Sequence, residues 1–280
     1  MALRIVTDST SYLPEGFAEK HGLAVVPLKV SVDGVFFREF VEITPDAFYA
    51  KQKAGARSGT TQPGPEDFIA VYGRLLQDPQ DTVLSIHLSS AMSGTLNSAY
   101  IAAEQTDADR IHLYDVRTSG LGLGFMVMTA VRMAEHGAGV GEILTVLDGM
   151  QARTHIYFLV GTMRYLIEGG RVGKAAGVAA SILQIKPILT VKDGIVDVFE
   201  RPRTMRTARD RMWALIDQAV VKGIESIGFH YAGNKAEVEA MQKEFTRRTG
   251  IAAVLSQLGP VVGCHTGPET TAVVIVDKPD

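Results

Sequence analysis

The sequence predicts an α/β protein of two domains, an N-terminal domain built on a parallel sheet and a C-terminal domain with a mixed sheet. Between residues 82 and 150, short apolar runs alternate with longer helical stretches, which is typical of parallel strands covered by helices. After residue 153 a hairpin signal, Asp193-Gly194, indicates antiparallel pairing. A chain of 280 residues also suits two domains better than one. We place the domains at residues 1–155 and 156–280.

Turn and capping residues divide the first 76 positions. Pro14 suits the first turn of a helix, and Asp33-Gly34 is a hairpin signal between two apolar runs. Thr44 and Pro65 mark two further helix starts, and the second of these helices has apolar residues at the 3.6-residue spacing of a buried face. The expected elements are a strand at 3–6, a helix at 14–20, hairpin strands at 25–32 and 35–37, and helices at 44–52 and 65–76.

The next segment carries the strand–helix alternation. Its last long helical stretch is apolar almost throughout residues 121–131. We expect this stretch, together with residues 178–183, to form either a wall for an apolar ligand or ordinary core. The expected elements are strands at 82–86 and 111–116 and helices at 94–105, 120–135 and 140–150.

In the C-terminal part the regular alternation of strand and helix stops. A second hairpin is expected around Asp193-Gly194, and two longer helices flank the strand that follows it. The expected elements are strands at 155–160, 188–191, 195–198, 226–230, 252–255 and 272–276, and helices at 163–168, 175–183, 204–221 and 235–248.

Composition excludes several classes of protein. Hydrophobic residues make up 46% of the chain and charged residues 21%, which is the composition of a globular protein. A net charge of −3 disfavours nucleic acid as a partner, because nucleic-acid-binding proteins carry a basic face. The single cysteine, Cys264, allows no internal disulfide and fits a reducing compartment. The start of the chain lacks a signal-peptide pattern, and residues 121–131 are far fewer than the roughly 20 of a membrane span. We expect cytoplasmic localisation and no integral membrane association.

Six short polar clusters stand at the expected ends of strands or starts of helices, where open α/β sheets bind ligands. They offer hydroxyls, backbone amides, one imidazole and one guanidinium, which are the groups of an anion site. They contain no metal-ligand pattern. The clusters lie at residues 7–10, 60–63, 89–95, 169–171, 186–187 and 265–268.

Two clusters offer hydroxyl groups. Ser93, Gly94 and Thr95 are expected to open a helix, where free backbone amides favour a carboxylate or phosphate. Ser93 would either donate to that anion or only cap the helix. Thr60 and Thr61 supply adjacent hydroxyls in a proline-stiffened loop, which suits either a fixed donor position or an ordinary capping loop.

Two other clusters offer a cation and an imidazole. Arg171 follows Gly169-Gly170, a usual helix stop, and is either a fixed cation beside an anionic head group or a complement to the helix end. His265 lies in a Gly/Pro-rich segment that we expect to be a rigid loop. Adjacent side chains of extended backbone point to opposite faces, so we do not expect Cys264 to pair with His265.

Taken together, the clusters resemble the DegV family of bacterial fatty-acid-binding proteins over nearly the whole chain. The matching motifs are Thr-Asp-Ser-Thr-Ser at 7–11, Thr-Thr-Gln-Pro at 60–63, Ser-x-x-Ser-Gly-Thr at 90–95, Tyr-Leu-x-x-Gly-Gly-Arg-Val at 165–172, Ile-Lys-Pro-Ile-Leu at 185–189 and Gly-Pro-Val-Val-Gly-x-His-Thr-Gly-Pro at 259–268.

The resemblance implies two α/β domains with a long-chain fatty acid held between or alongside them. The carboxylate would meet Thr60 and Ser93, with His265 close by. In better-understood members a separate fatty acid kinase phosphorylates the carboxyl, and the acyl phosphate feeds phospholipid synthesis. The resemblance therefore implies a carrier without catalysis, cofactor or metal, with Arg203 as a candidate contact for the kinase. The ligand-binding residues that we expect are Thr60, Thr61, Ser93, Gly94, Thr95, Arg171 and His265.

An enzyme remains the alternative hypothesis. It would act on a small anionic or acyl substrate, with Ser93 as nucleophile and His265 as general acid or base. Ser93 lacks the flanking glycines of a nucleophile elbow, and the sequence indicates no third residue to orient His265. A DNA-binding regulator is disfavoured by the charge and by the lack of a clear recognition helix.

Overall fold

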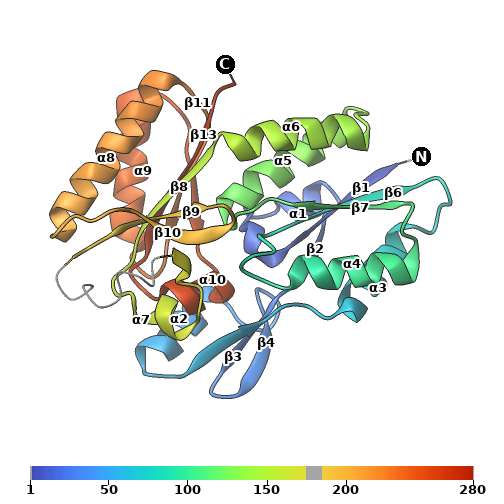
Figure 1. Cartoon of the computed structure of the whole chain (residues 1–280), viewed down its shortest axis with the longest axis horizontal. Coiled ribbons are helices and arrows are strands. Elements are labelled where there is room, and N and C mark those ends of the chain that lie inside the picture. The colour runs from blue at the N-terminus through green and yellow to red at the C-terminus, as the bar shows by residue number, and fades with distance from the viewer. Residues whose placement is uncertain (1, 175–184, 280) are drawn as a thin grey trace.

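The structure, a computed structural model, describes residues 2–174 and 185–279. Its strands form three sheets, a parallel one, a mixed one and a small antiparallel one (Figure 1). The predicted α/β class, with a parallel N-terminal sheet and a mixed C-terminal sheet, is confirmed. The predicted boundary between residues 155 and 156 falls within strand β8 (Thr154–Leu159), and the division into two domains stays a prediction.

The N-terminal sheet is parallel throughout, with the strand order β2-β1-β6-β7. Its strands are β1 (Leu3–Asp8), β2 (Ala24–Val26), β6 (Thr82–His87) and β7 (Ile111–Asp115). Its helices are α3 (Pro65–Leu75), α4 (Thr95–Thr106), α5 (Leu121–Glu135) and α6 (Val140–Ala152). Because strand side chains alternate between faces, Val6 and Val83 pack with α3 and α4, while Ile5 and Leu84 pack with α5 and α6.

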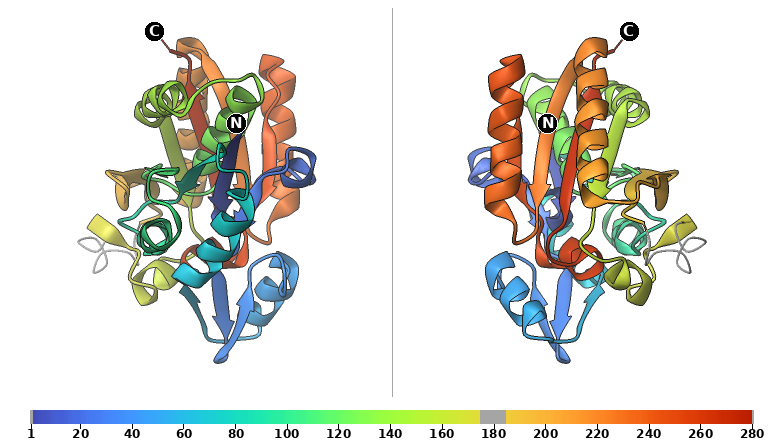
Figure 2. Two further views of the ribbon diagram at one scale, coloured as in Figure 1. Left: turned by 90° about the vertical axis from the view of Figure 1, so that its right-hand side faces the viewer. Right: turned by 90° about the vertical axis from the view of Figure 1, so that its left-hand side faces the viewer.

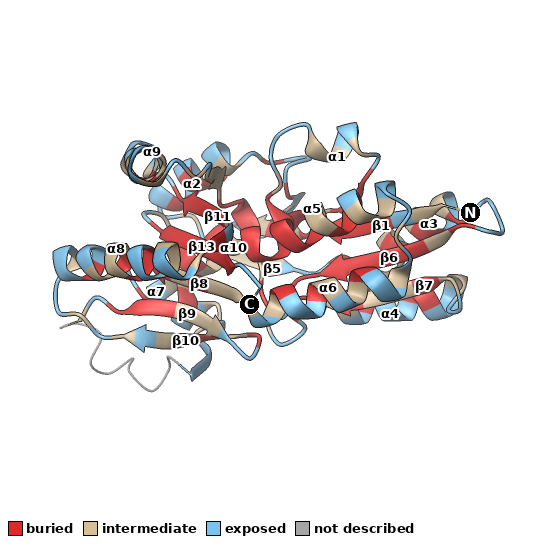
Figure 3. Ribbon diagram, turned by 90° about the horizontal axis from the view of Figure 1, so that it is seen from above, coloured by how far each residue is buried: buried red, intermediate tan, exposed pale blue. Residues whose placement is uncertain are grey.

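The C-terminal sheet has the order β10-β9-β8-β13-β11-β12, and only its β11–β12 pair is parallel. The strands added to β8 are β9 (Ile188–Lys192), β10 (Ile195–Glu200), β11 (Ile224–Tyr231), β12 (Val254–Gln257) and β13 (Thr271–Asp277). Helices α8 (Met205–Lys222) and α9 (Lys235–Thr249) cover one face and bury a cluster that includes Phe229 and Phe245 (Figure 1). Seen from above, buried residues fill the central strands while α8 turns an exposed side outward (Figure 3).

Helix α5 joins the two large sheets. It contacts β1 and β6 of the parallel sheet as well as β8, β11 and β13 of the mixed sheet. Its apolar residues, from Leu121 to Val131, belong to one core cluster that also contains Ile156 and Val274. Since both sheets bury apolar area against the same helix, α5 fixes the space between them.

The small sheet projects from one end of the molecule (Figure 2). It has the order β4-β3-β5 and consists of β3 (Lys29–Val32), β4 (Val35–Arg38) and β5 (Ser58–Thr61), with α2 (Pro45–Lys53) beside it. The short elements of the fold are the 3-10 turn η1 (Ser9–Ser11) and the helices α1 (Phe17–Lys20), α7 (Arg164–Glu168) and α10 (Pro260–Thr266).

Three local predictions were wrong. The strand predicted at 25–32 is divided into β2 and β3, because Pro27 cannot donate to a ladder. The loop predicted around Thr60 is strand β5, which pairs with β3. The rigid loop predicted around His265 is helix α10, which has Pro260 in its first turn. The helix predicted at 14–20 is shortened to Phe17–Lys20, and the one predicted at 175–183 lies outside the described residues.

Candidate functional site

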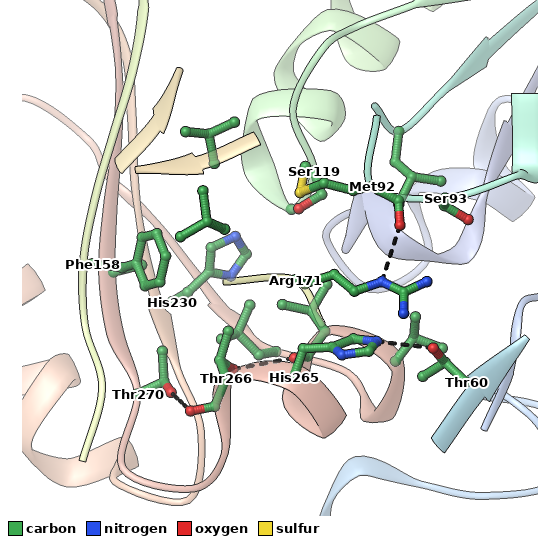
Figure 4. Close-up of a pocket in the computed structure, with 18 of the residues that line it drawn as sticks. Thr60, Met92, Ser93, Ser119, Phe158, Arg171, His230, His265, Thr266 and Thr270 are labelled. Carbon is green, nitrogen blue, oxygen red and sulfur yellow. Dashed lines mark hydrogen bonds between the residues drawn. The ribbon is translucent and has the colours of Figure 1, made fainter. Parts of the chain in front are cut away.

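A narrow cavity with about 110 Å³ of free space lies where the three sheets meet (Figure 4). Most of its wall is apolar, with side chains from the mixed sheet, from α7 and α10, and from the loop before α4. The polar residues Thr60, Ser93, Arg171 and His265 lie together at one end, while Ser119, His230 and Thr270 lie elsewhere along the wall (Figure 4). Apolar residues of this wall are Leu88, Ile156, Phe158, Leu166, Val191 and Val274. The cavity is therefore suited to a slender apolar ligand with one polar end.

Of the two interpretations given for residues 121–131, the structure supports ordinary core over a ligand wall. These residues pack in the core shared by the two sheets, and α5 reaches the cavity only through Gly120 at its start. Residues 178–183, the other stretch interpreted in this way, lie outside the described residues. Strands β8, β9, β10 and β13 supply the apolar wall instead.

Thr60 and His265 form the centre of the polar end. Thr60 Oγ1 lies 2.9 Å from Nε2 of His265. If Nε2 carries the ring proton, the imidazole donates to Thr60 and leaves the threonine hydroxyl free to donate to an anion. Nδ1 of His265 is buried and has no hydrogen-bond partner among the described residues. A Cβ atom at Gly169 would overlap this nitrogen, so the glycine makes room for the ring.

The electrostatics keep this imidazole neutral. Burial lowers the pKa of His265 to about 4, and the nearby positive charge of Arg171 acts in the same direction. At neutral pH His265 therefore supplies a hydrogen bond rather than a charge. The fixed positive charge at this end of the cavity belongs to Arg171.

Ser93 stands in the loop that leads into α4. Its hydroxyl lies 2.9 Å from Thr95 Oγ1 and accepts a hydrogen bond from the Thr95 amide at 3.3 Å. The loop is tied down by Ser89, whose hydroxyl donates to the Gly194 carbonyl at 2.7 Å. Gly94 lets the Gln62 side chain approach closely, since a Cβ atom there would come within 3.0 Å of it. Ser93 is thus a positioned hydroxyl and also a partner of the helix start.

Arg171 lies between these two groups (Figure 4). Its Nε donates to the Met92 carbonyl at 3.2 Å, and Nη1 donates to the Gly169 carbonyl at 2.8 Å. Both bonds use backbone acceptors, so they orient the guanidinium without neutralising it. No carboxylate among the described residues forms an ion pair with it, and its charge remains available to an anionic ligand.

Five of the seven predicted ligand-binding residues line the cavity. The other two, Gly94 and Thr95, follow Ser93 in the chain and do not line it. Arg203, the predicted kinase contact, is exposed in the segment before α8 and does not line the cavity either. The five that the structure brings together are Thr60, Thr61, Ser93, Arg171 and His265.

Sequence reasoning missed His230. It lines the cavity from β11, where Nε2 accepts the Leu121 amide at 2.8 Å and Nδ1 donates to the Ser256 carbonyl at 3.2 Å. Burial lowers its pKa to about 4, so this imidazole is also neutral. A single histidine in an apolar strand carries no sequence signal, because its partners lie far away along the chain. Thr266 and Thr270 also line the cavity and were not named as ligand-binding residues, although Thr266 belongs to the polar cluster at 265–268.

A second polar network lies behind the site. Asp8 accepts hydrogen bonds from the Thr10 amide and hydroxyl and from the Leu88 amide, and so orients these neighbouring groups. Its other partner is His87, whose Nε2 lies 2.7 Å from Ser85 Oγ. All these side chains are fully buried, so this Asp–His–Ser series meets no substrate and instead fixes the end of β6.

Glu39 links the small sheet to the helix that carries His265. Its carboxyl group accepts from the Val261 amide at 2.8 Å and from the Ser9 hydroxyl at 2.5 Å. Val261 lies one helical turn before His265 on α10. Burial raises the pKa of Glu39 to about 7, because desolvation outweighs these hydrogen bonds. The carboxyl group therefore changes charge near neutral pH at the base of α10.

The arrangement does not place Ser93 and His265 as a nucleophile and its base. His265 bonds to Thr60 and Ser93 to Thr95, and no hydrogen bond joins the two within the described part of the chain. That part also contains no group of three or more His, Cys, Asp or Glu side chains suited to a metal ion. Among its helices, none combines the length and the apolar character needed to cross a bilayer.

Comparison with known proteins gives consistent matches over the whole chain. The family model described as "Uncharacterised protein, DegV family" matches residues 2–278. A DegV domain-containing protein of Listeria innocua is 35% identical over 268 residues, covering 95% of each chain. The structure of a fatty-acid-binding DegV family protein from Thermus thermophilus has a TM-score of 0.91 at 35% identity, covering 99% of this chain and all of its own. A stearic-acid-binding protein from Eubacterium ventriosum has a TM-score of 0.88 at 27% identity, covering 99% of this chain and 98% of its own.

Proposed function

Because the chain belongs to the DegV family, we propose that it binds a long-chain fatty acid in the cavity between its sheets. The carboxylate lies at the end formed by Thr60, Ser93, Arg171 and His265, and the alkyl tail runs along the apolar wall. The single observation that carries this proposal is a largely apolar cavity with Thr60, Ser93, Arg171 and His265 gathered at one end, where they can serve an anion. Similar proteins of known structure are described as binding fatty acids, including stearic acid.

The tail supplies most of the affinity. Burying ~14 methylene groups at about 0.8 kcal/mol each contributes roughly 11 kcal/mol before the cost of association. Hydrogen bonds to the carboxylate add only about 1.5–3 kcal/mol each, much of it offset by desolvation. The polar end therefore fixes which end of the ligand faces the mouth of the cavity.

The carboxylate is held by neutral donors and one cation. Thr60 and Ser93 each donate a hydroxyl hydrogen, and His265 orients Thr60 through the bond at 2.9 Å. Arg171 supplies the balancing charge. Such a site holds an anion without a catalytic base, which favours a carrier over an enzyme.

We further propose that the protein is a cytoplasmic carrier that presents the carboxylate to a separate fatty acid kinase. In that transfer a carboxylate oxygen bonds to the terminal phosphorus of a nucleoside triphosphate. The bond from this phosphorus to the bridging oxygen breaks, and a nucleoside diphosphate leaves with the electron pair. The carrier needs no cofactor, and the exposed Arg203 is available to contact the kinase.

Mass spectrometry of lipid extracted from the purified native protein tests this function. We expect one long-chain fatty acid for each chain. Extracts that repeatedly contain only phospholipid, nucleotide or no lipid would contradict the proposal. The isolated protein, given ATP and palmitate, is expected to form no acyl phosphate, which separates the carrier from an enzyme.

A further inference from the structure

A polar side chain stands in the wall of the cavity away from its polar end. Ser119 lines the cavity from the segment that leads into α5, and Figure 4 shows it apart from Thr60 and His265. Its hydroxyl group forms no hydrogen bond with any described residue. Against an alkyl tail this hydroxyl would also lose its hydrogen bonds to water, which costs free energy. A plain hydrocarbon chain therefore leaves Ser119 without a partner.

The other polar residues in this part of the wall already have partners. His230 uses both of its ring nitrogens on backbone groups. Thr270 and Thr266 each donate a hydroxyl hydrogen to a backbone carbonyl oxygen, at 2.9 and 3.2 Å respectively. Ser119 differs from all three, because within the described part of the chain both its hydrogen and its oxygen lone pairs are free. A polar atom of the ligand can therefore still bind to it.

The start of α5 holds a second hydroxyl group without a partner. Thr118 is only 5% exposed, and its Oγ1 makes no hydrogen bond among the described residues. This oxygen lies 3.1 Å from the position that a Cβ atom of Gly122 would occupy, and Cδ1 of the wall residue Ile156 lies 3.2 Å from the same position. The first turn of a helix carries partial positive charge, which favours an electron-rich atom. The edge of the apolar wall beside α5 is therefore suited to an oxygen atom.

We propose that the cavity takes a long-chain fatty acid with one oxygen on its chain, as a hydroxyl or oxo group, and that Ser119 binds this oxygen. The proposal rests on the proposed function and adds the class of fatty acid. The chain oxygen accepts the Ser119 hydroxyl hydrogen, and a chain hydroxyl can also donate to Ser119 Oγ. A site that hydrogen-bonds a ligand hydroxyl discriminates against the analogue without it, because its own polar group is left unpaired. Since Ser119 lies apart from Thr60 and His265, the oxygen belongs to the tail and not to the carbons beside the carboxylate.

Binding assays with a series of fatty acids of one chain length test this inference. Stearate carries no oxygen on its chain, and 3-, 10-, 12- and 18-hydroxystearate carry one hydroxyl at increasing distance from the carboxyl group. The test variant is Ser119→Ala, which leaves Thr60, Arg171 and His265 unchanged. The matched control is Ser226→Ala on β11, a serine outside the cavity whose side chain also forms no hydrogen bond with a described residue.

The quantity to compare is the dissociation constant of each hydroxystearate divided by that of stearate. For 10- or 12-hydroxystearate we expect Ser119→Ala to raise this ratio about tenfold, since the ligand hydroxyl loses its hydrogen bond in an apolar wall. Stearate should bind this variant as tightly as wild type or up to about threefold more tightly, because no unpaired hydroxyl then faces the tail. The control variant should leave every ratio unchanged.

Ratios that stay unchanged for all four hydroxystearates would overturn the inference, and so would an equal rise for all of them. A rise confined to 3-hydroxystearate would also overturn it, because Ser119 would then belong to the carboxylate end. A rise confined to 18-hydroxystearate would support the inference and place the oxygen at the end of the tail. Failure of the wild-type protein to bind any acid of the series would instead refute the proposed function.

Discussion

At the scale of single residues, the site works through neutral hydrogen-bond donors around one fixed charge. Burial makes both cavity histidines neutral, but they do different things. His230 is held by two backbone groups, whereas His265 bonds to a threonine and keeps one ring nitrogen unpartnered among the described residues. Through Nε2 the His265 ring sets the position of the Thr60 hydroxyl, one of the proposed carboxylate donors. His265 is therefore the residue whose loss should separate binding from presentation.

We predict that His265→Ala still folds and binds palmitate with at most about a tenfold loss of affinity, because the tail dominates binding. Kinase-dependent formation of acyl phosphate should fall further, by roughly a hundredfold. The reason is that Thr60 loses the imidazole that orients its hydroxyl toward the carboxylate to be phosphorylated. Calorimetry and a coupled assay with labelled ATP measure the two quantities. His136→Ala, at the exposed end of α5, is the control.

An isolated wild-type protein that turns over ATP and palmitate, and loses that turnover in His265→Ala, would favour the enzyme hypothesis. Equal losses of binding and of phosphorylation in the variant would show instead that His265 acts through ligand affinity alone. Either result would contradict the division between an affinity-giving tail and an orienting head.

At the scale of elements, α10 is the part whose position decides the site. Glycines and one buried carboxyl group determine where it lies. Gly169 after α7 leaves space for His265, and Gly263 within α10 leaves space for the Tyr49 ring. Glu39 holds the first turn through the Val261 amide. These contacts come from α7, α2 and the end of β4, so α10 is positioned by its neighbours.

We predict that Gly169→Ala displaces the His265 ring and weakens palmitate binding several-fold. The φ of Gly169 is −78°, so the effect comes from overlap with the ring rather than from backbone strain. Overpacking of this kind costs typically about 1–3 kcal/mol. Chemical shifts of the imidazole nitrogens report the displacement. Gly149→Ala on α6 is the matched control, since nothing lies within 4 Å of its missing Cβ. Unchanged His265 shifts in Gly169→Ala would show that the space is not needed.

We predict a pH-dependent effect of Glu39→Gln on the free energy of unfolding. Glu39 has its pKa raised from 4.5 to about 7, so the folded protein holds this proton where the unfolded chain has released it. The stabilisation that this bound proton gives the folded protein is fully present below pH 4.5 and is lost as the pH rises to about 7. Glutamine cannot ionise, so the variant should gain up to about 3 kcal/mol relative to wild type across this window.

Urea unfolding at pH 4.5, 6 and 8 measures this difference. His230 and His265, whose depressed pKa values destabilise the fold on acidification, are present in both proteins and cancel in the comparison. A difference in the free energy of unfolding that is the same at all three pH values reflects the hydrogen bonds that glutamine cannot make. If the difference did not change with pH, Glu39 would not titrate near neutrality.

At the scale of the whole molecule, sequence patterns predicted the layers better than the cavity. The alternation between residues 82 and 150 gave the parallel sheet, because each helix there buries its face against neighbouring strands. Ser93 and His265 could be found because they stand in polar clusters near element ends. Strand β5 could not be predicted, because its polar sequence forms a strand only when it pairs with β3. Helix α10 could not be predicted either, because its glycine-containing sequence is helical only when packed against the neighbouring elements. The wall could not be assigned, because burial in core and burial in a cavity leave the same apolar sequence.

We predict that Ala272→Leu changes the preferred length of the ligand. Ala272 lies on β13 opposite Phe158, and its small side chain forms part of the wall. A larger side chain would exclude part of the tail at a cost of about 0.8 kcal/mol for each methylene displaced. Palmitate should lose affinity while decanoate keeps it, as measured by competition with a fluorescent fatty acid. Thr271→Val, whose side chain faces the other layer, is the control. Equal effects on both acids would place Ala272 outside the path of the tail.

The cavity draws its lining from the mixed sheet, the small sheet and the loops that follow strands of the parallel sheet, and this affects how long the protein survives in a cell. A ligand held there is bound only when all three sheets are assembled, so it stabilises their assembly and not any one of them. The empty chain lacks this contribution and opens more often to proteases. We therefore expect its turnover to slow as fatty acid becomes abundant, so that the supply of lipid sets the amount of carrier without any change in gene expression.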